Sequence, residues 1–172
     1  MLRKFIEIVL AAVCFIIQTS FFQHFKIAGV APNLLVVLVS AIGFMRGKNE
    51  GLFIGFVSGL FIDLFFSSVI GFNILVYSFV GYLNGFFTKE FLPEDVKLPV
   101  VLIVGSDIVA NTIIYLIIFL FRGDFSFYYY LINLIVPEVV YTLLVTIVLY
   151  FIILKVNKKL EEYEKRSASK FG

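Results

Sequence analysis

Long apolar runs separated by charged residues make up most of this 172-residue chain. A helix needs roughly 20 apolar residues to cross the hydrocarbon core of a bilayer. The run from Gly51 to Phe87 is too long for one crossing, and we place a turn at Ser67–Gly71 because Ser and Gly favour turns. The pattern then predicts six membrane-spanning helices, at about residues 8–25, 27–45, 51–66, 71–87, 98–121 and 129–154.

The composition agrees with a membrane environment. Hydrophobic residues make up 61% of the chain and charged residues only 15%. A soluble protein of this size would need more charge on its surface, whereas lipid replaces water around a membrane protein. We therefore expect an all-α, polytopic membrane protein, with a six-helix transmembrane domain over residues 1–155 and a polar C-terminal tail over residues 156–172.

The distribution of Lys and Arg predicts the orientation, because basic residues concentrate on the cytoplasmic side of membrane proteins. With both termini in the cytoplasm, the outer side receives only Lys26 and Arg122. The cytoplasmic side receives Arg3, Lys4, Arg46, Lys48, Lys89, Lys97, Lys155, Lys158, Lys159, Lys165, Arg166 and Lys170. This asymmetry favours six spans with cytoplasmic N and C termini.

Several chemistries find little support in the sequence. Cys14 is the only cysteine and His24 the only histidine, so a metal site built from Cys and His ligands is excluded. A nucleophile paired with histidine would have to use His24. The loops are too short for a catalytic domain, and a net charge of +2 gives no reason to expect nucleic acid as a partner. We expect a protein without enzymatic activity and without a cofactor.

Glycines recur at helical spacing in the third and fourth predicted spans. The third span carries Gly51, Gly55, Gly59 and then Asp63, each four residues apart, and the fourth span carries Gly81 and Gly85. Glycine at this spacing lets another helix approach closely. We favour packing within the protein, and the alternative is a face for a partner helix or a second copy of the chain.

Three carboxylates lie within the predicted spans: Asp63, Asp107 and Glu138. A charged, unpaired carboxylate at the bilayer centre costs roughly 2.5–3.5 kcal/mol. No Lys or Arg lies in any predicted span to balance them. Asp63 falls in the outer half, where it could accept hydrogen bonds from the first N–H groups of the next helix. We favour this structural role over a proton or ligand site.

The other two acids lie near further polar or helix-bending residues. Asp107 has Asn111 one turn later on the same face, which suits either an interhelical hydrogen bond or a polar pocket. Glu138 follows Pro137, which should kink the sixth span. We hypothesise that Glu138 clusters with Asp63, since both fall at a similar depth.

A set of short motifs runs through nearly the whole chain. They are Pro32-Asn33-Leu34-Leu35 opening the second span with Pro32 in its first turn, Gly51-x3-Gly55-x3-Gly59-Leu60-x2-Asp63, Gly71-Phe72, Gly81-Tyr82 and, more loosely, Pro137-Glu138. This pattern resembles the rod shape-determining MreD family. The resemblance implies a non-enzymatic scaffold of the cell-wall elongation complex in the bacterial inner membrane. It implies binding to an MreC-like single-span protein, regulation of peptidoglycan synthesis, and indirect links to RodA, a class B penicillin-binding protein and MreB.

The family also looks distantly similar to the S components of energy-coupling-factor transporters. That similarity implies a compact six-helix bundle, and it supplies a rival function, a subunit for uptake of a small molecule such as a vitamin. Many S components carry an Ala-x3-Ala docking pattern in the first span, whereas here Ala11 and Ala12 are followed four positions on by Phe15 and Ile16. This departure weakens the rival. The face that binds the partner, a homodimer and a pocket for membrane lipid all remain open.

Overall fold

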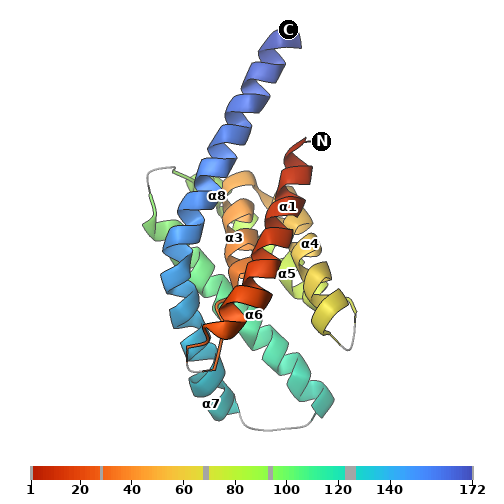
Figure 1. Ribbon diagram of the computed structural model, residues 1–172, viewed down its shortest axis with the longest axis vertical. Coiled ribbons are helices and arrows are strands. Elements are labelled where there is room, and N and C mark those ends of the chain that lie inside the picture. Colours follow the sequence, from red (N-terminus) through yellow and green to blue (C-terminus); the bar gives the residue numbers. More distant parts are fainter. Residues whose placement is uncertain (1, 28, 68–69, 93–94, 123–126, 172) are drawn as a thin grey trace.

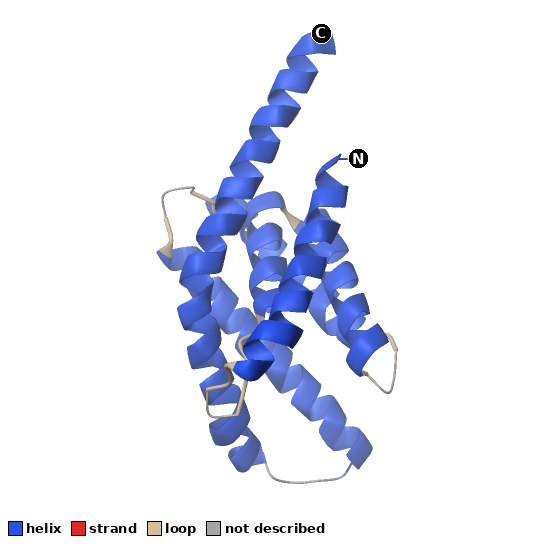
Figure 2. Cartoon of the chain, in the orientation of Figure 1, coloured by secondary structure: helices blue, strands red, loops and turns tan. Residues whose placement is uncertain are grey.

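The computed structural model describes residues 2–27, 29–67, 70–92, 95–122 and 127–171, and the regular elements among these residues are helices (Figure 2). In chain order they are α1 (Leu2–Ile16), η1 (Ile17–Phe21), α2 (Phe22–His24), α3 (Leu34–Arg46), α4 (Lys48–Phe66), α5 (Phe72–Asn84), η2 (Gly85–Glu90), α6 (Lys97–Arg122), α7 (Phe127–Tyr130), η3 (Leu131–Ile135) and α8 (Val136–Phe171). Here η1 and η3 are π-helical turns and η2 is a 3₁₀-helix. The predicted all-α class is confirmed for this part of the chain.

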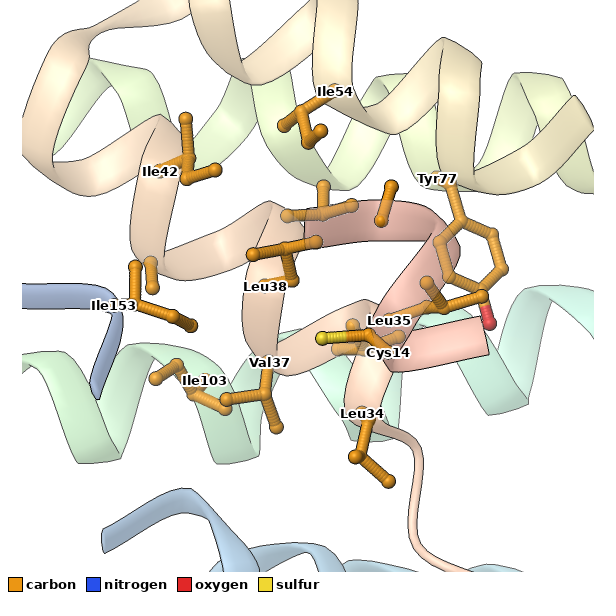
Figure 3. Close-up of a cluster of buried hydrophobic side chains, with 14 of the residues drawn as sticks. Cys14, Leu34, Leu35, Val37, Leu38, Ile42, Ile54, Tyr77, Ile103 and Ile153 are labelled. Carbon is orange, nitrogen blue, oxygen red and sulfur yellow. The ribbon is translucent and has the colours of Figure 1, made fainter. Parts of the chain in front are cut away.

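Helix α3 forms the centre of the bundle. Every residue from Leu34 to Met45 is buried, and α3 contacts α1, α4, α5, α6 and α8. Its apolar side chains meet Ile54, Ile103 and Ile153 from the surrounding helices (Figure 3). A helix that is hydrophobic on all sides is buried inside a protein or lies in a membrane. The uninterrupted apolar sequence of α3 is therefore compatible with its central place.

The helix lengths support a helical membrane protein but define fewer crossings than predicted. Among the described residues, four helices are long and apolar enough to cross a membrane, namely Leu2–His24, Lys48–Phe66, Lys97–Ile117 and Tyr128–Ser167. Helix α3 has 13 residues, or about 20 Å of length, against a hydrocarbon core of about 30 Å. The six predicted helical segments thus form, while α3 and α5, with 13 residues each, are shorter than a full span.

The second predicted span begins later than expected. We predicted a helix from residue 27 with Pro32 in its first turn, but α3 begins at Leu34, and Asn33 is its N-cap. The Asn33 side-chain oxygen accepts a hydrogen bond from the Val36 N–H at 3.2 Å. Proline restricts the preceding residue to extended conformations, so Pro32 separates the irregular chain from the helix.

The irregular segment before α3 pairs its backbone with itself and with α8. Ile27 and Val30 exchange two N–H···O hydrogen bonds of 3.1 Å, and the Tyr141 hydroxyl donates to the Phe25 carbonyl at 2.9 Å. Non-helical backbone is tolerated at membrane depth only where its polar groups find partners in the protein. These contacts meet that requirement in part.

The predicted turn between the third and fourth spans is confirmed in its described residues. Helix α4 ends at Phe66, and Gly71 is the N-cap of α5 with a φ of 106°. Only glycine adopts this φ at low cost. Ser68 and Val69, which we also assigned to the turn, lie outside the described residues.

The start of α1 and the end of α8 lie at the same end of the molecule (Figure 1). Helix α8 continues without a break from Val136 to Phe171, so the polar tail extends it as a helix beyond the bundle.

Candidate functional site

The glycine series of α4 packs directly against α5. A Cβ atom added at Gly59 would lie 2.5 Å from the Ile74 Cα, and one at Gly55 would overlap the Tyr77 and Ser78 backbone. Gly51, Gly81 and Gly85 face backbone atoms of the opposite segment in the same way. The structure thus supports packing within the protein, and α5 covers this face so that no partner helix can reach it.

Asp63 caps the start of α5, as its position predicted. Its side chain is 1% exposed and accepts from the N–H groups of Gly71 at 2.9 Å, Asn73 at 3.2 Å and Ile74 at 3.1 Å. The Asn73 side-chain amide adds a fourth hydrogen bond at 2.8 Å. These donors include N–H groups that a helix N-terminus leaves without intrahelical partners. The acid that ends the glycine series therefore joins α4 to α5 by polar contacts.

A second group of polar residues, some buried and some partly buried, lies between α3, α5, α6 and α8. We call it the intramembrane polar cluster, and it consists of Asn33, Tyr77, Asp107, Asn111, Glu138 and Thr142. The Asn111 amide donates to Asp107 Oδ1 at 3.3 Å and to Glu138 Oε1 at 3.2 Å. The predicted pairing of Asp107 with Asn111 is confirmed. The hypothesised cluster of Glu138 with Asp63 is wrong, because Glu138 bonds to Asn111 whereas Asp63 bonds to the start of α5.

Asn33 connects this cluster to the start of α3. Its backbone N–H donates to Thr142 Oγ1 at 3.0 Å, and its side-chain oxygen accepts from the Tyr77 hydroxyl at 3.1 Å. Sequence reasoning selected Asn33 only as part of a helix start. It missed Tyr77 and Thr142, although Thr142 lies one turn after Glu138 on the same helix.

The two carboxyl groups of the cluster lack a basic partner. Arg3 and Arg46 pair with Glu161 and Glu164 near the far end of α8, and no ion pair to Asp107 or Glu138 is found in the described part of the chain. Asp107 is 0% exposed, and its Oδ2 atom has no hydrogen-bond partner. Ionisable groups at membrane depth are costly, so such a group is a candidate functional site.

A third group of polar residues joins both ends of the chain. Arg3 donates to Glu164 through two hydrogen bonds of 2.7 and 2.6 Å and to Asn157 at 2.9 Å, while Arg46 donates to Glu161 at 3.0 Å. We call these five residues the terminal ion-pair cluster. It holds the polar extension of α8 against the start of α1 and the end of α3. No local sequence pattern predicted it.

We expect acid to release the extension of α8 from α1. The Arg3 guanidinium holds the pKa of Glu164 below its usual value of 4.5. A carboxyl group with a lowered pKa in the folded state contributes its full stabilisation above the unfolded pKa and loses it as the pH falls through the folded pKa. Spin labels on α1 and on the extension should therefore separate below about pH 4.5. Arg3→Ala should show the separated state already at neutral pH, and an unchanged distance in that variant would contradict this role for the ion pair.

The buried central helix, the four long apolar helices and the polar groups inside the bundle define a helical, multi-pass membrane protein. The sequence matches the family of the rod shape-determining protein MreD over residues 1–160, and the chain belongs to this family. No match to the sequence was found among curated proteins or solved structures. Family membership confirms the resemblance drawn from the motifs and assigns the protein to the determination of rod shape.

Proposed function

We propose that the protein is a non-enzymatic scaffold of the bacterial wall-elongation complex that binds an MreC-like single-span protein and thereby helps regulate peptidoglycan synthesis. It lies in the inner membrane with both termini in the cytoplasm, and it acts on RodA, a class B penicillin-binding protein and MreB indirectly. Two findings support this proposal: the family match over residues 1–160 and the bundle of apolar helices.

The observation that carries the binding role is the environment of Gly105 on α6. Among the helical glycines that the structure describes, Gly105 is the one with no atom within 4 Å of an added Cβ. It is exposed on the outer surface of the bundle, near Val101, which is 67% exposed, and Ile108, which is 43% exposed. The other helical glycines that the structure describes pack closely against atoms of neighbouring segments within the protein.

The absence of a side chain at Gly105 leaves a notch on the exposed face of α6. A notch of this kind suits a partner helix in the membrane. Lipid tails are as apolar as the side chains, so helices associate there by close packing, and small residues permit the closest approach. Gly105 lies about 12 Å along α6 from Lys97. In the proposed orientation this position falls in the cytoplasmic half of the membrane. A single-span helix is therefore the expected occupant.

Gly105→Phe should abolish recovery of the MreC-like partner in co-purification from membranes, because the ring fills the notch. The variant should still fold, since its side chain points into open space. Val148→Phe is the matched control, because Val148 is 63% exposed on α8 and offers no notch. Equal recovery of the partner with both variants would exclude this face. Loss of self-association, with the partner retained, would instead assign the notch to a homodimer.

A further inference from the structure

We propose that the intramembrane polar cluster is a binding site for a sodium ion, held chiefly by the carboxyl groups of Asp107 and Glu138. This inference is independent of the partner-binding face on α6. It assigns to the protein a ligand of a different chemical class from the protein partners, a small metal cation taken from solution.

The first argument is charge. Asp107 on α6 and Glu138 on α8 bond to the same Asn111 amide, so their carboxyl groups lie close together. Neither acid forms an ion pair with a basic side chain in the described part of the chain. Two carboxylates at membrane depth repel each other and are poorly solvated. A cation between them removes both costs.

The second argument is the oxygen atom without a partner. The Asp107 side chain is fully buried, and its Oδ2 atom makes no hydrogen bond. A proton on the carboxyl group would neutralise its charge and turn this oxygen into a hydrogen-bond donor. A bound cation satisfies the charge and the oxygen together. The cluster also offers a hydroxyl oxygen, that of Thr142, which accepts a hydrogen bond from the Asn33 N–H.

The third argument is the backbone around the cluster. The π-helical turn η3 and Pro137 immediately precede Glu138, and the non-helical segment before α3 leads into Asn33. Prolines and π-helical turns interrupt the regular hydrogen bonds of a helix, often at functional sites. Broken helices in the middle of the membrane supply the ion sites of many transporters. The cluster therefore includes residues that closely follow irregular backbone, at the start of α8 and at the start of α3.

The ligand set favours a monovalent ion. Calcium takes six to eight oxygen ligands, and magnesium keeps several waters in an octahedral shell. The described part of the chain has no group of three or more acidic, His or Cys ligands that could hold a metal ion. Two carboxyl groups and a hydroxyl suit sodium, which carries a single charge and loses its water more easily.

The test is the thermal stability of the purified full chain in nanodiscs. Sodium chloride should raise the apparent melting temperature by roughly 3 °C over choline chloride at equal ionic strength and neutral pH, because an ion that binds only the folded protein stabilises it. Asp107→Asn and Glu138→Gln should each abolish this shift, whereas Glu162→Gln, on the exposed extension of α8, should retain it. Dialysis against radioactive sodium should show bound ion in the wild type and not in Glu138→Gln.

The outcomes distinguish the possible occupants of the cluster. A shift with magnesium or calcium but not with sodium would overturn the choice of ion. If acidification without sodium stabilised the protein and sodium added nothing, the cluster would bind protons alone and the proposal would fail. It would also fail if sodium stabilised the wild type and both variants equally.

Discussion

Replacing Gly55 by alanine should destabilise the protein by about 1–3 kcal/mol, the usual cost of forcing an extra group into a packed core. The added Cβ would overlap backbone atoms of Tyr77 and Ser78, which no side-chain rotation can relieve. Helices α4 and α5 would have to separate, and α5 also carries Tyr77 into the polar cluster. We therefore expect the substitution to disturb the interior as well as the helix pair.

Gly105→Ala is the matched control for this prediction. Its Cβ meets no atom within 4 Å, and alanine is favoured over glycine in a helix by roughly 1 kcal/mol. Melting curves in the same detergent compare the two variants, with about 2–4 °C expected per kcal/mol for a chain of this size. A Gly55→Ala protein that melts with or above the Gly105→Ala protein would refute the close packing of α4 on α5.

The contrast between these two glycines marks the limit of what the sequence could predict. The spacing of Gly51, Gly55 and Gly59 indicated a helix-packing ridge because the pattern is local and periodic. It did not indicate α5 as the partner, since that contact depends on how the chain folds back. Gly105 has no periodic companion, and only the structure separates it from the others.

The helix boundaries show the same division between local and long-range information. Charges and turn residues predicted most helix positions, because burying a charge in lipid is costly wherever it occurs. The late start of α3 depends on Asn33, whose N–H bonds to Thr142, 109 residues further along the chain. The partners of Asp63 lie within 11 residues, and that site was predicted. Arg3 and Glu164 are 161 residues apart, and their ion pair was not.

Replacing Asp63 by alanine should destabilise the protein by about 3 kcal/mol, the upper range for leaving a buried polar group without its partner. Four hydrogen bonds would be lost, from the backbone of Gly71, Asn73 and Ile74 and from the Asn73 side chain. We expect less than the sum of four such losses, because Gly71 is only partly buried and water can replace some of them. Hydrogen exchange should show the N–H groups of residues 71–74 losing protection before the rest of α5.

Two further variants separate capping from a general effect of removing an acid. Asp63→Asn keeps one acceptor oxygen and should fall between the wild type and Asp63→Ala. Asp95→Ala removes a single exposed hydrogen bond to the Lys97 N–H and should cost about 1 kcal/mol or less. The capping role requires this order of melting temperatures, together with local loss of protection at the start of α5. Equal stability of Asp63→Ala and Asp95→Ala would mean that the buried hydrogen bonds of Asp63 contribute no more than those of an exposed cap.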